Sequence, residues 1–133
     1  MAAVLLDTNV LIRLIGEPDR LPRPVRDHLA DPGTDLVLSA ASAWEVATKT
    51  RSGRLPGGEL LVSTWGETLA RLRIAQLPIE PEDALLAGGL EWDHRDPFDR
   101  VIVAQAQRRA LTVATSDRVL LGAGRVRVLD ARG

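Results

Sequence analysis

Residues 3–15 read AVLLDTNVLIRLI, a short apolar run that passes directly into a pattern of a different period. The first four residues, 3–6, are all apolar, which suits a strand buried on both faces of a sheet. Beyond Asp7 the apolar positions have the spacing of one helical face, and they are Val10, Leu11, Leu14 and Ile15. A buried strand followed at once by an amphipathic helix predicts the first unit of an α/β fold.

The same alternation continues to the end of the chain. Apolar runs suited to buried strands recur at residues 3–6, 36–38, 75–79, 111–114 and 126–129, and the stretches between them have helical patterns. One of these stretches is predicted as a helix with a single apolar face, formed by Leu61, Trp65, Leu69 and Leu72. Strands separated by helices favour a mainly parallel central sheet with helices on both faces, a three-layer α/β/α sandwich.

The chain has 133 residues, a length that suits a single domain over residues 1–133. It contains no cysteine, which excludes a disulfide framework, a thiolate metal site and a cysteine nucleophile. The N-terminus lacks the pattern of a secretory signal, and no apolar run approaches the roughly 20 residues of a membrane span. We therefore expect a cytoplasmic protein that does not contact membranes.

Charge and aromatic content limit how the chain could bind a nucleic acid. A net charge of −1 gives no overall positive field, so a polyanion would have to be bound locally. Lys49, Arg51 and Arg54 are interpreted either as a solvated basic face or as phosphate contacts. The aromatic side chains, few for a protein that holds bases by stacking, are Trp44, Trp65, Trp92 and Phe98.

Two aspartates follow predicted strands. Asp7 comes directly after the run 3–6, and Asp117 ends the segment Thr115-Ser116-Asp117 that follows the run 111–114. Each has a structural interpretation as a helix cap or turn residue. Each also has a functional one, because the ligand crevice of an open α/β sheet lies beyond the carboxyl ends of its strands.

Glu45 and Asp99 are predicted in the first turns of two helices. Glu45 follows Ser42 at the spacing of a capping box and precedes Lys49 at the spacing of a helical ion pair. Asp99 follows Asp96, which could cap that helix, and a negative charge in the first turn complements the helix dipole. These structural interpretations stand beside a role in metal binding.

All four acids could share one edge of the sheet, where strand ends and helix N-termini meet. Converging carboxylates raise one another's pKa unless a cation lies among them. Mg²⁺ or Mn²⁺ would resolve this conflict, because hard divalent cations prefer carboxylate oxygens together with water. The placement of these acids therefore favours a divalent-metal site formed by Asp7, Glu45, Asp99 and Asp117.

Four segments resemble motifs of the PIN-domain family. They are residues 5–9 (LLDTN), residues 39–49 around Trp44-Glu45, residues 94–100 (HRDPFDR) and residues 115–117 (TSD). Their order and spacing run the length of the chain, and the similarity is strongest to the VapC-type branch, the ribonuclease toxins of bacterial and archaeal toxin–antitoxin pairs. The resemblance implies that the catalytic, metal-binding acids are Asp7, Glu45, Asp99 and Asp117.

The resemblance also implies a mechanism and partners. A carboxylate-held Mg²⁺ or Mn²⁺ would activate a water for hydrolysis of an RNA phosphodiester. The residues expected to orient the carboxylates through hydrogen bonds are Thr8, Asn9, Thr115 and Ser116. Asp96 either caps its helix or supports the site. His94 is expected in a loop or in support of the ligands, and not as a ligand itself. Arg100 either helps to bind substrate or pairs with a carboxylate. The expected partners are RNA, an inhibitory antitoxin protein and a second copy of the chain in a homodimer.

Three other functions compete with this interpretation. A phosphatase or dehalogenase with an aspartate nucleophile would want a second aspartate two residues after Asp7, where this chain has Asn9. A response-regulator receiver would need an adjacent acid pair before the turn of its first strand and a late Lys-Pro step, and neither is found. A PIN fold kept only for binding is disfavoured by the intact set of acids.

Overall fold

The computed structural model describes residues 3–133. The strands are β1 (Ala3–Leu6), β2 (Asp35–Ser39), β3 (Ile74–Leu77), β4 (Thr112–Thr115) and β5 (Val128–Asp130). The helices are α1 (Thr8–Gly16), the short 3-10 helix η1 (Pro18–Arg20), α2 (Arg23–Ala30), α3 (Ala40–Arg51), α4 (Gly58–Ser63), α5 (Trp65–Arg71), α6 (Pro81–Gly89), α7 (Pro97–Arg109) and α8 (Arg118–Gly122). β1 has the predicted bounds, and the other strands differ from the predicted ranges by one or two residues at each end.

The five strands form one sheet in the order β3-β2-β1-β4-β5, and every pairing is parallel. The chain therefore builds outward from β1 to β3 and then returns to the other side of β1 with β4. The strand order reverses between β1 and β4, and the carboxyl ends of all five strands point to the same edge. Such a reversal opens a crevice beyond the strand ends, where α/β proteins bind ligands.

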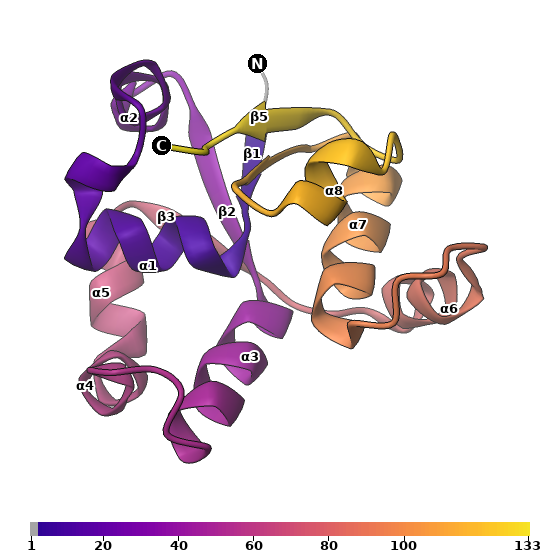
Figure 1. The fold of residues 1–133 in the computed structure, drawn as a ribbon, viewed down its shortest axis with the longest axis horizontal. Helices are drawn as coiled ribbons and strands as arrows, with labels where there is room; N and C mark the ends of the chain where they lie inside the picture. Colours follow the sequence, from indigo (N-terminus) through magenta and orange to yellow (C-terminus); the bar gives the residue numbers. More distant parts are fainter. Residues whose placement is uncertain (1–2) are drawn as a thin grey trace.

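The side chains of β1 alternate between the two faces of the sheet. Val4 and Leu6 belong to a core that also includes residues of α1, α2 and α5. Leu5 belongs to a second core, which includes Ile102 and Ala106 of α7. Helices thus cover both faces of the sheet (Figure 1), which confirms the predicted three-layer α/β/α sandwich.

Small residues bring α3 and α6 against α7. Ala41 of α3, Ala87 of α6 and Ala104 of α7 lie in one buried cluster. Because helix separation depends on the side chains at the contact, alanines allow a close approach. This packing holds α3, which carries Glu45, beside α7, which carries Asp99.

The single helix predicted over residues 61–72 is wrong, because α4 ends at Ser63 and α5 begins at Trp65. Thr64 lies between them with φ −114° and ψ 21°, and its hydroxyl donates to the carbonyl oxygen of Leu60 at 2.8 Å. A side chain that bonds the preceding turn in this way competes with the backbone helix ladder. The apolar face survives the break, since Leu69 is buried and Trp65 packs against the same core.

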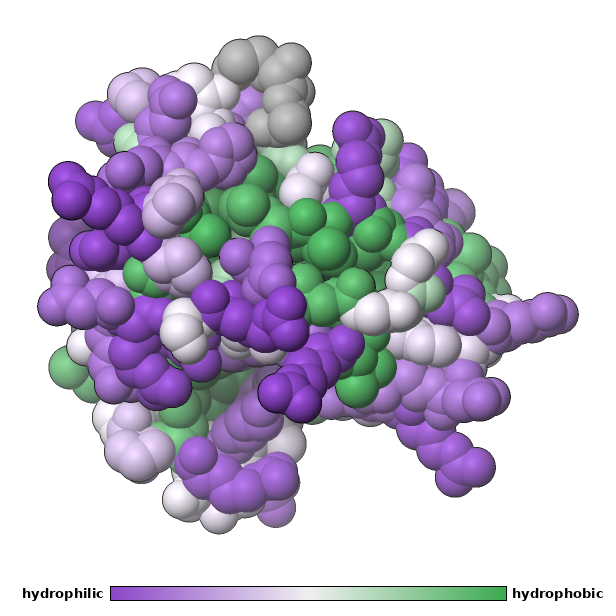
Figure 2. Space-filling view, turned by 45° about the horizontal axis from the view of Figure 1, so that its top comes forward, coloured by the Kyte–Doolittle hydropathy of each residue, from purple (hydrophilic) through white to green (hydrophobic). Residues whose placement is uncertain are grey.

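Some large apolar side chains remain on the surface. Those with more than a third of their surface exposed are Ile15, Trp44, Leu60, Val62, Leu85 and Val119. Figure 2 shows one face of the molecule, on which apolar residues gather near the centre and hydrophilic residues surround them. Within residues 3–133, the helices are too short or too polar for any of them to cross a bilayer.

Candidate metal and active site

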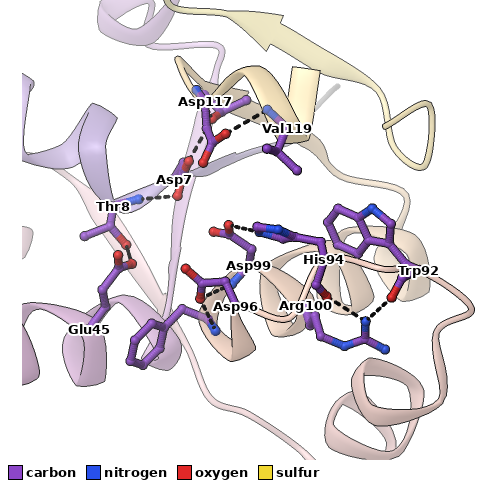
Figure 3. Close-up of polar contacts among 12 residues, drawn as sticks. Asp7, Thr8, Glu45, Trp92, His94, Asp96, Asp99, Arg100, Asp117 and Val119 are labelled. Atoms are coloured by element: carbon purple, nitrogen blue, oxygen red, sulfur yellow. Dashed lines mark hydrogen bonds and ion pairs between the residues drawn. The ribbon is translucent and has the colours of Figure 1, made fainter. Parts of the chain in front are cut away.

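Asp7 lies at the end of β1 (Figure 3), where it meets Thr115 at the end of the neighbouring strand β4. The Thr115 hydroxyl donates to Oδ2 of Asp7 at 2.7 Å and accepts from the backbone N–H of Asp117 at 2.9 Å. The backbone N–H of Thr8 donates to Oδ1 of Asp7 at 2.8 Å. Asp7 is 4% exposed, so these donors replace most of the water that its carboxylate would otherwise bind. Asp7 therefore begins α1 and also faces the carboxyl edge of the sheet.

Glu45 lies in the second turn of α3, not in the first turn where the sequence predicted it. The helix is capped by Ser39, whose Oγ accepts from the N–H of Ala41 at 3.0 Å, so the capping box predicted for Ser42 is wrong. Ser42 and Glu45 instead turn toward α1. Oγ1 of Thr8 lies 2.6 Å from Oε1 of Glu45 and 2.9 Å from Oγ of Ser42, and the Thr8 hydroxyl donates to the carboxylate.

The predicted helical ion pair of Glu45 and Lys49 forms, with Nζ 2.7 Å from Oε2. It is not the exposed pair that the spacing suggested, because Glu45 is 7% exposed and only Lys49 reaches solvent. A buried carboxylate with one hydroxyl and one ammonium partner is held in a fixed orientation. Glu45 is thus aimed at Thr8 and, through it, at the end of β1.

Asp96 is the N-cap of α7, as one of its two interpretations predicted. Its Oδ1 accepts from the N–H groups of Phe98 at 2.9 Å and Asp99 at 3.3 Å. Asp99 follows in the first turn, where it is buried, and its Oδ2 lies 2.6 Å from Nε2 of His94. His94 therefore lies in a loop and touches a candidate metal ligand, which agrees with its expected place in a loop or in support of the site.

Asp117 caps α8 by accepting from the N–H of Val119 at 2.8 Å, and it remains half-buried. Figure 3 shows it beside Asp7, across from Asp99. Among the other predicted supporting residues, Asn9 donates to Oδ2 of Asp7 at 3.3 Å. Ser116 has no side-chain hydrogen bond to the four acids within residues 3–133.

Burial and the charges of neighbouring carboxylates strongly raise the pKa of two of these carboxyls. Burial raises the pKa of Asp7 to about 6, against the hydrogen bonds from Thr115 and Thr8 that lower it, and the charges of Glu45 and Asp117 add to the rise. Burial likewise raises the pKa of Asp99 to about 7, although its contact with His94 opposes this rise. The charges of Asp7, Asp96 and Asp117 raise it further. Such shifts in a cluster of acids are typical of functional sites.

The donor set fits a hard divalent cation. Its atoms are carboxylate oxygens, and Oδ1 of Asn9 beside Asp7 is buried without a hydrogen-bond partner among residues 3–133. Within the same residues, the one compact set of possible ligand atoms, all within 4.8 Å of one another, comes from His94, Asp96 and Asp99. Asp7, Glu45 and Asp117 lie outside this set, so a cation shared by all four predicted acids would need bridging waters, which Mg²⁺ retains readily.

The interpretation of Arg100 as the partner of a carboxylate is wrong. Its guanidinium turns away from Asp99 and donates to backbone carbonyl oxygens of Ala87, Leu90, Trp92 and His94. Arg100 therefore belongs to the support of the loop that carries His94.

Comparisons with known proteins place the chain in a family. The PIN domain family matches residues 4–125. A chain of VapBC2 from Rickettsia felis, in a structure bound to a DNA fragment from the promoter, has a TM-score of 0.72 at 14% identity, over 97% of this chain and 98% of that one.

Two further structures have the same fold. A chain of VapBC-5 from Mycobacterium tuberculosis, a member of the VapBC family of toxin–antitoxin systems, has a TM-score of 0.62 at 23% identity, over 100% of both chains. A chain of FitAcB from Neisseria gonorrhoeae has a TM-score of 0.61 at 23% identity, over 96% of both chains. No curated protein sequence matches the chain.

Proposed function

The chain belongs to the PIN-domain family, and on that premise we propose that it is a divalent-metal-dependent endoribonuclease and the toxin of a toxin–antitoxin pair. VapC-type PIN domains are nucleases, so the family match supports a hydrolase that acts on nucleic acid. The observation that carries the proposal is the gathering of buried acids that follow β1 or lie in α3 and α7 at one edge of the sheet. The proposal takes residues 1–133 as one domain.

In the proposed site, Asp7, Glu45 and Asp99 hold Mg²⁺ or Mn²⁺ directly or through water. Asp117, which is more exposed, has a peripheral role. When bound, the cation supplies a water of lowered pKa and neutralises charge on the phosphate. The hydroxyls of Thr8 and Thr115 keep the carboxylates of Glu45 and Asp7 in place, because each donates to one of their oxygens.

Substrate would approach along the exposed end of α3. Lys49 lies one turn beyond Glu45 and is 41% exposed at its side chain, and Arg51 and Arg54 are exposed beyond it. Cations at these positions would contact the phosphates that flank the cleaved bond, a contribution to affinity that does not depend on base sequence. The charges of Arg51 and Arg54, which lie beyond the Lys49–Glu45 pair, supply local positive charge where the chain has no overall positive field.

We further propose an antitoxin partner, a homodimer and a cytoplasmic location. The structural relatives named above include toxin–antitoxin proteins, which suggests the same kind of partner here. The apolar residues gathered on the face in Figure 2 offer surface for a protein partner, since large exposed apolar patches commonly mark such contacts.

The proposal is tested with the purified chain, a mixed pool of single-stranded RNA and p-nitrophenyl phosphate as a phosphomonoester. We expect internal cleavage of the RNA that requires Mg²⁺ or Mn²⁺, stops in EDTA and is lost in Asp7→Asn. Asp27→Asn, an exposed change on α2, is the matched control and should cleave normally. Hydrolysis of the phosphomonoester without RNA cleavage would replace the ribonuclease by a phosphatase, and binding of RNA without any hydrolysis would indicate a binding module.

A further inference from the structure

Arg100 makes an unusual set of hydrogen bonds for a residue next to a candidate metal ligand. Nε donates to the carbonyl oxygen of Ala87 at 2.8 Å, and Nη2 donates to that of Leu90 at 2.7 Å. Nη1 donates to the carbonyl oxygens of Trp92 at 2.8 Å and His94 at 2.9 Å (Figure 3). One guanidinium thus donates hydrogen bonds to several carbonyl groups along residues 87–94. It forms no ion pair with a carboxylate within residues 3–133.

The carbonyl groups of Ala87, Trp92 and His94 have no other donor within residues 3–133, whereas that of Leu90 also accepts from the N–H of Trp92 at 2.9 Å. Ala87 lies in the last turn of α6, where helix carbonyls have no intrahelical partner, and residues 90–94 form a loop without a helix or strand. A guanidinium presents five N–H donors in one rigid plane, so it can bind several carbonyls at fixed relative positions. A lysine ammonium at this position could bind fewer of them and would impose no plane.

The loop held in this way ends at His94, whose ring returns to the site. Nε2 of His94 lies 2.6 Å from Oδ2 of Asp99, while the His94 carbonyl is bound by Arg100. The adjacent residues Asp99 and Arg100 therefore hold the same histidine, one by its ring and the other by its backbone. Trp92 supports the ring from the side, with ring centroids 4.9 Å apart.

We propose that Arg100 is a positioning residue of the metal site, which fixes the 87–94 segment so that His94 orients the carboxylate of Asp99. The inference rests on the proposed function, because it assigns a support to the same site. Arg100 touches neither the cation nor the substrate in this scheme. Its effect passes through the loop to His94 and from there to one oxygen of Asp99.

The test compares Arg100→Lys with a matched control, Arg109→Lys. Both arginines lie on α7 and both tie it to α6. Arg109 does so at the N-terminal end of α6, through Glu80 at 2.8 Å and Asp83 at 2.9 Å. Each variant is examined without metal by hydrogen–deuterium exchange of the amides of residues 88–95, and its affinity for Mn²⁺ is measured by calorimetry.

We expect Arg100→Lys to expose the 88–95 amides to faster exchange while the amides of β1 and β4 stay protected. Its dissociation constant for Mn²⁺ should rise about 10- to 100-fold, the usual effect of losing a residue that orients a metal ligand. Arg109→Lys should change neither quantity. Loss of protection throughout β1 and β4 in Arg100→Lys would assign Arg100 to general stability and overturn the proposal.

A double variant tests whether Arg100 acts through His94. If it does, adding Arg100→Lys to His94→Ala should not weaken Mn²⁺ binding beyond the effect of His94→Ala alone, because the pathway is already broken. Effects that multiply would overturn the proposal. His94→Gln, which keeps a side-chain N–H donor, should recover part of the lost affinity. Exchange and Mn²⁺ binding need no substrate, so a wild-type chain that fails to cleave RNA would refute the proposed function and leave this test intact.

Discussion

Replacing Asp99 by Asn separates its role as a metal ligand from its role as an acidic residue in the first turn of α7. The substitution keeps the size of the side chain and an oxygen that can accept from His94, and it removes the charge. Burial and the neighbouring carboxylates raise the pKa of Asp99 from 3.8 to about 7. This rise means that, without metal, the folded chain destabilises the charged form of Asp99 relative to the protonated form by up to about 4 kcal/mol.

The stability effect therefore depends on pH in a defined direction. At about pH 3, below both the unfolded value of 3.8 and the folded value of about 7, the carboxyl is protonated in the folded and the unfolded chain alike, so the Asn variant and the wild type should melt at nearly the same temperature in EDTA. At pH 8 the wild type carries the buried charge and the variant does not, and the variant should be more stable by about 2 to 4 kcal/mol. For a domain of this size that gain raises the melting temperature by on the order of 10 °C.

Cleavage of the mixed RNA pool in Mn²⁺ should fall at least about 100-fold in the same variant, because the cation loses a charged ligand. A helix whose first turn merely favours a negative charge would instead lose up to about 1 kcal/mol at pH 8 and keep its activity. Asp27→Asn is again the control. Near-normal cleavage, or a lower melting temperature in EDTA at pH 8, would refute the assignment of Asp99.

Three further predictions concern the neighbours of Asp99 and the protein as a whole. Thr115→Val removes the hydroxyl that donates to Asp7 at 2.7 Å, which should raise the pKa of Asp7 further and weaken Mn²⁺ binding about 10-fold at pH 7. Thr115→Ser keeps this hydroxyl and should keep the affinity for Mn²⁺. Equal affinities for the two variants would contradict the prediction. Because the pKa values of Asp7 and Asp99 lie at about 6 and about 7 instead of 3.8, the metal-free native state binds more protons than the unfolded chain between about pH 4 and pH 7. Its melting temperature in EDTA should therefore fall as pH rises through this window, with saturating Mn²⁺ opposing the fall, and a steady rise would count against the shifted values. Asp83→Ala removes the buried carboxylate that accepts from Arg109 and Gln105. The free energy of unfolding measured in urea should fall by about 3 kcal/mol, while the affinity for Mn²⁺ stays unchanged. Weaker Mn²⁺ binding would show that this network also supports the metal site.

Local patterns in the sequence were sufficient to predict the layers of the fold. The apolar run 3–6 is long enough only for a buried strand, and β1 has those bounds. Asp96 and Pro97 predicted the start of α7 because a cap and the proline at the first helical position act within one turn. The single helix predicted over residues 61–72 was wrong, because the spacing of its apolar residues carries no information about the hydrogen bond of the Thr64 hydroxyl that accompanies the break.

The acids were also identified from the sequence, but the environment of each depends on the tertiary structure. The hydrogen bond from Thr115 to Asp7 joins residues 108 positions apart, and the one from Thr8 to Glu45 joins residues 37 positions apart. The strand order makes the first contact possible by placing β4 next to β1. No periodicity or spacing in the chain specifies that order.

Arg100 gives the sharpest contrast between the two levels. From the sequence, Arg100 was interpreted either as a contact to substrate or as the partner of a neighbouring carboxylate. In the folded chain, α6 packs against α7, and the guanidinium meets the carbonyl groups of Ala87, Trp92 and His94, which have no other donor within residues 3–133. Burying such groups unpaired costs more free energy than a partly exposed ion pair returns, so the arginine turns to the backbone. Residue types therefore determine which groups can bind, whereas packing determines which buried groups still need a partner.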